Sequence, residues 1–114
     1  MKRIAFILCI VLASSTSMAA GFRVTSEIKS LFLGPQYGSK VFIEVANRPT
    51  TARPPGCTDN ANFDFVLDLN HEHAKEYYSA LLAAYAAGKT IQLESYNDCS
   101  VYGSVPGLKT IFLR

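Results

Sequence analysis

The stretch Asn70–Lys89, NHEHAKEYYSALLAAYAAGK, decides how the rest of this chain can fold. Asn70 suits a helix N-cap, because its side-chain oxygen can accept hydrogen bonds from the free amides of the first turn. Gly88 readily adopts the left-handed conformation that ends a helix, and Lys89 places a cation at the negative end of the helix dipole. The sequence therefore predicts one helix over this stretch.

The predicted helix has two faces of different character. At 100° per residue, one apolar stripe should pack against strands; its members are Ala74, Tyr77, Tyr78, Leu81 and Tyr85, with Leu82 at its edge. The opposite face begins with Glu76 and Ser79 and continues as Ala80, Ala83, Ala86 and Ala87. The high helix propensity of alanine explains this charge-free face, and close packing against a neighbouring subunit is the alternative.

Five strand-like segments surround the helix, three before it and two after it. Alternating apolar and polar side chains between turn residues mark them. They are expected at Arg23–Leu33, Lys40–Ala46, Phe63–Leu69, Thr90–Tyr96 and Lys109–Leu113. In the first segment the alternation slips at Leu31-Phe32-Leu33, which predicts a bulge or a bend there.

The same alternation predicts which strand residues face the core. These are Val41, Ile43, Val45, Phe63, Phe65, Leu67, Leu69, Ile91 and Leu93. Asp64, Val66 and Asp68 then lie on the other face of the third segment, where we expect both carboxylates to meet solvent.

The element order is strand, strand, strand, helix, strand, strand. This is the order of the OB-fold, a five-stranded Greek-key barrel whose helix lies between strands 3 and 4. An α+β sandwich with the same order is the alternative. The sequence shows no internal repeat or linker, so residues 20–114 are predicted to form a single OB-like domain.

The first 19 residues have the pattern of a secretory signal peptide. Lys2 and Arg3 form a basic start, Ile4–Ala13 is an apolar run of ten, and Ser17-Met18-Ala19 fits the small-residue cleavage rule. Ten apolar residues are too few to cross roughly 30 Å of hydrocarbon as a helix. We therefore expect a secreted or periplasmic protein without a membrane span after processing.

Loss of the leader changes the charge and the cysteine content. The full chain has 11 Lys and Arg against 9 Asp and Glu, and the leader carries two of the basic residues. The mature protein is then near neutral, which argues against a nucleic-acid partner. Cys9 also leaves, so Cys57 and Cys99 are predicted to form a disulfide in an oxidising compartment. Two free thiols or half of a zinc site are the alternatives.

Four motifs between Cys57 and Leu113 carry a resemblance to a known family. They read Phe65-Val66-Leu67-Asp68, then Lys75–Ala84 continuing to Gly88-Lys89, then Thr90-Ile91-Gln92-Leu93, and finally Cys99-Ser100. In these motifs the chain resembles small exported bacterial OB-fold proteins similar to the B subunits of subtilase-cytotoxin-type and pertussis-type toxins. The resemblance implies a non-catalytic binding subunit, often a homopentamer that serves a separately encoded catalytic subunit. It assigns no sugar-contacting residue to this chain.

No group of residues predicts an enzyme. His71-Glu72-His73 is the one cluster that suggests a metal, but histidines two apart on a helix point about 200° away from each other. The chain has no nucleophile elbow, no phosphate-binding glycine loop and no cofactor signature. We therefore predict no catalytic residue, no metal site and no cofactor.

Tyrosines in two predicted loops are the best candidates for ligand binding. OB-folds commonly bind oligosaccharides or oligonucleotides with the loop after strand 1 and the loop between strands 4 and 5. A tyrosine ring can stack on a sugar while its hydroxyl makes hydrogen bonds. The candidate residues are Tyr37, Tyr96, Asn97, Asp98 and Tyr102. In the simpler alternative, the tyrosines close the barrel ends and the polar residues make turns.

Two classes of binding protein fit this pattern. A glycan-binding module is favoured by export, near-neutral charge, the element order and the loop tyrosines. The alternative is an exported inhibitor or another protein-interaction module. In that case Arg48–Gly56, with Arg53 and the stiff Pro54-Pro55, would enter an acidic cleft of a target protein.

Overall fold

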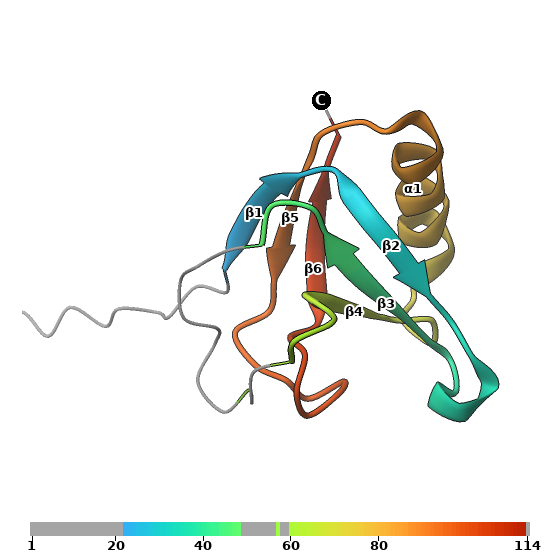
Figure 1. Ribbon diagram of the computed structural model, residues 1–114. Helices are drawn as coiled ribbons and strands as arrows, with labels where there is room; N and C mark the ends of the chain where they lie inside the picture. Colours follow the sequence, from blue (N-terminus) through green and yellow to red (C-terminus); the bar gives the residue numbers. More distant parts are fainter. Residues whose placement is uncertain (1–21, 49–56, 58–59, 114) are drawn as a thin grey trace, which may run out of the picture.

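The computed structural model describes residues 22–48, 57 and 60–113 and contains two three-stranded antiparallel sheets and one helix (Figure 1). The strand orders are β1-β5-β6 and β2-β3-β4. The strands are β1 Arg23–Ser26, β2 Ile28–Phe32, β3 Lys40–Val45, β4 Phe65–Asp68, β5 Ile91–Ser95 and β6 Leu108–Phe112. The helix α1 spans Ala74–Ala87, and a short 3₁₀ helix, η1, spans Pro35–Tyr37. The α+β class predicted from the sequence is confirmed. The predicted signal peptide lies outside the described residues.

The first predicted strand is divided into two at Glu27. β1 pairs with β5, whereas β2 pairs with β3, so the chain passes from one sheet to the other at this residue. Ser26 stabilises the passage, because its hydroxyl accepts from the Asn47 amide at 2.8 Å and donates to the Glu27 carbonyl. The pairing register shifts between Ile28 and Ser30. The prediction of an irregularity at residues 31–33 is therefore wrong in its position.

The two sheets also meet between β4 and β6. Val66 and Gly107 form an isolated parallel bridge, and the Val66 amide donates to the Pro106 carbonyl at 3.0 Å. One bridge does not continue the strand pairing, so the described residues do not form a closed five-stranded barrel.

The main core lies between the sheets and α1. Its buried members are Val24, Ile28, Val41, Ile43, Val45, Phe65, Leu67, Leu81, Ala84, Ile91, Leu93 and Leu108. The core-facing residues predicted for β3 and β5 are confirmed. Phe63 is an exception, because it lies before β4 and packs instead with Phe42 on the other side of the sheet. Leu69, after β4, is partly buried against the core.

Helix α1 ends as predicted but begins later. Gly88 is left-handed with φ of 61°, and its amide and that of Lys89 close the last turn. At the other end the cap position is His73, without a side-chain hydrogen bond, so the N-cap predicted at Asn70 is wrong. The reason is a preceding turn, in which Asp68 Oδ1 accepts from the Asn70 amide at 2.9 Å.

The buried stripe of α1 also differs from the predicted one in its last turn. Ala74, Leu81 and Ala84 are buried, whereas Tyr85 is 46% exposed. Tyr77 and Tyr78 are partly buried against the core, and the Tyr77 hydroxyl donates to the Lys109 carbonyl at 2.9 Å. The last turn therefore meets the core through the small side chain of Ala84.

Asp64 is 1% exposed, so its predicted place in solvent is wrong. Its Oδ2 accepts from the Val45 amide at 2.9 Å, and its Oδ1 lies 3.3 Å from Arg48 Nε. These contacts explain the burial, because a buried carboxylate needs hydrogen bonds and an opposite charge. The pair holds Arg48 at the base of the segment that follows β3.

The predicted disulfide between Cys57 and Cys99 is confirmed. It joins the segment before β4 to the loop after β5, with the two Cα atoms 5.5 Å apart. Two irregular segments far apart in the sequence are thus tied together. Among the residues that the structure describes, no helix has the length and apolar character to cross a membrane.

Candidate functional site

A second apolar cluster covers the outer face of the β2-β3-β4 sheet. Successive strand residues point to opposite faces, so Phe42 and Val66 point away from the main core. Phe42 lies opposite both Phe32 on β2 and Val66 on β4, and the three form a row across the sheet. Phe42 and Val66 are nonetheless buried, at 1% and 0% exposure. Residues from neighbouring loops must therefore cover them.

The covering residues are mainly aromatic. The ring centroid of Phe42 lies 5.0 Å from that of Tyr37, 4.9 Å from that of Tyr102 and 5.1 Å from that of Phe63. Phe32 contacts Tyr37 at 5.6 Å and Phe63 at 5.4 Å. We call these five residues the aromatic cluster. Its edge-to-face contacts are favourable arrangements for aromatic rings and fix their positions relative to one another.

Two loops bring the cluster's tyrosines together. Tyr37 ends η1, the turn between β2 and β3, where its amide donates to the Gly34 carbonyl at 3.1 Å. Tyr102 lies in the loop between β5 and β6, and its carbonyl accepts from the Val105 amide at 3.0 Å. The two ring centroids are 6.3 Å apart. Both loops lie at the lower end of the molecule in Figure 1.

The other three candidate residues lie apart from this pair. Tyr96 follows β5, is 39% exposed and makes no ring contact with the cluster within the described residues. It instead lines a small cavity of about 80 Å³ with Tyr77 and Gly107. Asn97 is exposed. Asp98 stabilises its own turn, because its Oδ1 accepts from both the amide and the hydroxyl of Ser100.

Sequence reasoning missed the three phenylalanines beneath and beside the tyrosines. The signal was present in β3, where Val41-Phe42-Ile43 is apolar on both faces of the strand. An uninterrupted apolar run indicates a strand that is covered on both sides. The alternation predicts only the residues that face the main core.

The aromatic cluster combines an exposed apolar edge with two hydroxyl groups. Phe32 is 38% exposed and Leu33 beside it is 45% exposed. Tyr37 and Tyr102 are partly buried, and neither hydroxyl makes a hydrogen bond within the part of the chain that the structure describes. Such a surface can contact the apolar face of a small ring while the hydroxyls bond its polar substituents.

The two histidines of the predicted cluster lie on the surface before and at the start of α1. His71 and His73 are both exposed, and His71 Nδ1 accepts from the His73 amide at 3.1 Å. Their ring centroids are 6.0 Å apart. In the described ranges, no three His, Cys, Asp or Glu side chains come together in a way that could hold a metal ion.

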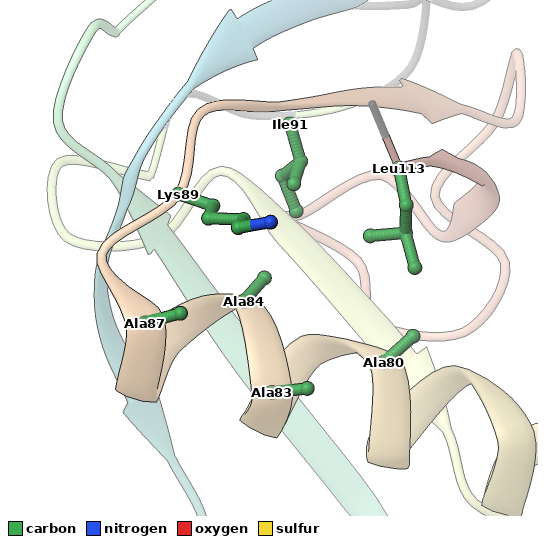
Figure 2. Close-up of a pocket in the computed structure, with 7 residues that line it drawn as sticks. All are labelled: Ala80, Ala83, Ala84, Ala87, Lys89, Ile91 and Leu113. Atoms are coloured by element: carbon green, nitrogen blue, oxygen red, sulfur yellow. The ribbon is translucent and has the colours of Figure 1, made fainter.

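The alanine face of α1 forms one wall of an apolar groove (Figure 2). The groove has a volume of about 280 Å³ and is lined by Ala80, Ala83, Ala84, Ala87, Lys89, Ile91 and Leu113. Figure 2 shows Ile91 and Leu113 directed toward the helix, with the Lys89 side chain lying across the space between them and the alanines. Three of the four alanines on the predicted charge-free helix face, Ala80, Ala83 and Ala87, therefore line this groove.

Comparisons of the chain with family models, with curated proteins and with solved structures give no match.

Proposed function

We propose that this protein is an exported, non-catalytic glycan-binding module whose aromatic cluster contacts the sugar. The observation that carries the proposal is the meeting of Tyr37 and Tyr102, which come from two separate loops, over Phe42. Exposed Phe32 extends the apolar surface, and the tyrosine hydroxyls supply hydrogen bonds. Stacking and hydrogen bonding together suit a ligand with one apolar face and many hydroxyls.

We further propose that the fold is an incompletely closed variant of the OB-fold. β1 and β2 then count as one bent strand shared by both sheets. The helix falls between the third and fourth strands of that count, and the parallel contact of Val66 with Gly107 lies where a barrel would close. In this numbering Tyr37 and Tyr102 lie in the two loops with which OB-folds commonly bind oligosaccharides.

Export is part of the proposal, with the protein secreted or periplasmic. The basic start and short apolar run of the leader support it, as does the Cys57–Cys99 disulfide, which an oxidising compartment favours. Mass spectrometry of the secreted material should give a chain beginning at Ala20, or at Gly21 if cleavage occurs one residue later. A secreted product that retains Met1 would contradict this expectation.

The toxin-subunit resemblance leads us to propose self-assembly, as a homopentamer, with a separately encoded catalytic partner. Its support in this chain is the second half of α1. From Tyr77 to Gly88 the helix carries no charged residue, although Leu82 and Tyr85 are 42% and 46% exposed. Exposed apolar area of this kind is typical of surfaces that bind another protein.

Assembly through this face predicts an effect of adding charge to it. Ala83→Glu with Ala86→Glu should convert the oligomer to single chains, because two carboxylates would have to be desolvated at the contact. Light scattering on the wild type, on this variant and on a Lys75→Glu control measures the particle mass. A wild type that scatters as a single chain at high concentration would reject self-assembly.

A glycan-array screen of the folded, oxidised protein tests the main proposal. We expect binding to a limited set of glycans, and we expect Tyr102→Ala to weaken or abolish those signals. Tyr102→Phe, which retains the ring contact with Phe42, should keep most of the signal. A blank array would overturn glycan binding, and a protein captured through an Arg53-dependent loop would then favour the inhibitor alternative. Arg53 lies outside the described residues, and Arg48 is held by Asp64.

A further inference from the structure

The outer face of the β1-β5-β6 sheet contains a second hollow, away from the aromatic cluster. Its volume is about 310 Å³, and its lining consists of Arg23, Gln92, Glu94, Thr110 and Phe112. All three strands of the sheet contribute. A site built on paired strands holds its side chains more precisely than one built on loops.

The strand register places these five side chains on one face. Arg23 is opposite Glu94 across β1 and β5, while Gln92 and Glu94 are opposite Phe112 and Thr110 across β5 and β6. Directly opposite residues in antiparallel strands share a face, as do residues two apart on one strand. The intervening residues Ile91 and Leu93 are buried in the main core. The hollow is therefore a defined array on a rigid sheet.

Glu94 forms ion pairs with Arg23, which also lines the hollow, and with the neighbouring Lys109. Arg23 Nε forms an ion pair with Glu94 Oε2, and Lys109 Nζ lies 3.8 Å from Glu94 Oε1. The Glu94 side chain is only 17% exposed, and both of its carboxylate oxygens face a cation. A guanidinium has five N–H donors, and this ion pair uses the one on Nε. Arg23 can therefore still donate to a ligand beside the Glu94 carboxylate, whose lone pairs can accept from one.

The other lining side chains are an aromatic ring, an amide and a hydroxyl, from Phe112, Gln92 and Thr110. Phe112 is 51% exposed and lines the hollow together with four polar side chains. Gln92 is partly buried, and its amide makes no hydrogen bond with any other described residue. Thr110 adds an exposed hydroxyl.

We infer that this hollow binds a single pyranose unit. The Phe112 ring would contact the C–H face of the sugar, and the paired Arg23 and Glu94 would donate to and accept from neighbouring hydroxyls. Gln92 can both donate and accept, which suits a hydroxyl group that does the same. The inference takes its ligand class from the proposed glycan-binding function but locates a separate site.

A titration followed by NMR tests this site directly. Isotope-labelled wild-type protein is titrated with the methyl glycosides of glucose, galactose and mannose. At least one glycoside should shift the backbone signals of Gln92, Thr110 and Phe112 together with the side-chain amide of Gln92. Phe112→Ala should weaken that binding about tenfold, as loss of an aromatic contact does, while Phe112→Tyr should retain it.

A neighbouring residue provides the matched control. Leu113 is similarly exposed, at 56%, but lines the alanine groove and not this hollow. Leu113→Ala should therefore leave the titration unchanged. Gln92→Ala, which removes an amide without touching the ring, is a second probe should Phe112→Ala fail to fold.

The possible outcomes separate this site from the proposed function. Shifts at Tyr37 and Tyr102 without shifts at Gln92 and Phe112 would support glycan binding by the aromatic cluster and overturn the second site. Shifts at the hollow alone would support the second site and count against the cluster. Absence of shifts with all three glycosides would overturn the pyranose site, while the glycan array would still decide the function.

Discussion

Leu81→Ala should lower the free energy of unfolding by about 3–4 kcal/mol, because it removes buried methyl groups and leaves a cavity. Leu81 is 0% exposed and lies on α1, where it packs into the main core between the sheets and the helix. The loss would be a large share of the roughly 5–15 kcal/mol that stabilises a domain of this size. Denaturant unfolding followed by circular dichroism measures it.

The adjacent residue is a matched control with the same side chain. Leu82 is 42% exposed, so Leu82→Ala should cost less than about 1 kcal/mol. Both substitutions make the same change in helix propensity, so the difference between them isolates burial. Equal effects for the two leucines would contradict the orientation of α1 against the sheets.

Replacing Cys57 and Cys99 together by serine should lower the free energy of unfolding by about 4 kcal/mol. The disulfide closes a loop that spans 42 sequence positions, and its loss restores that conformational freedom to the unfolded chain. The loop after β5 that contains Cys99 also contains Tyr102, so ligand binding should weaken as well. Unfolding curves of the wild type and the double variant give the stability difference.

A reductant supplies the internal control for this prediction. Adding it should destabilise the wild type toward the level of the double variant and leave the double variant unchanged. If the reductant affected neither protein, Cys57 and Cys99 would not be paired in the native state. The role of the disulfide in joining the two irregular segments would then be lost.

The main core was predictable because its sequence signal is periodic. Val41, Ile43 and Val45 alternate with other residues along β3, and Ile91 and Leu93 do so along β5. Such alternation indicates a strand with one buried face, whatever the topology of the sheet. The helix end was equally clear, because Gly88 is the residue type that a left-handed cap requires.

The errors occurred where another hydrogen bond or ion pair outweighed the preference read from a single residue. Asn70 is a good N-cap in isolation, but the Asp68 carboxylate holds its amide in a turn and the helix starts later. Asp64 reads as a surface residue until Arg48 and the Val45 amide are placed beside it. Arg48 and Val45 are distant from Asp64 in the sequence, so no short window around Asp64 contains this information.

The candidate site was predictable in part. The two loops identified from the element order do bring Tyr37 and Tyr102 together. Tyr96 and Asp98 seemed equally suitable from composition, yet Asp98 stabilises a local turn and Tyr96 lines a different cavity. Phe42, beneath the tyrosines, was not predicted as part of the site. It lies in an uninterrupted apolar run, and such a run does not show which residue faces away from the main core.

The affinity of Tyr102→Ala for a glycan identified on the array tests the central claim most directly. Isothermal titration should show a loss of about 1–3 kcal/mol relative to wild type, as expected for removal of an aromatic contact. Tyr85→Ala is the matched control, because Tyr85 is 46% exposed on α1 and makes no ring contact within the described residues. We expect wild-type affinity for Tyr85→Ala and weakened binding for Tyr102→Ala. Equal affinities of Tyr102→Ala and the wild type would contradict binding by the aromatic cluster.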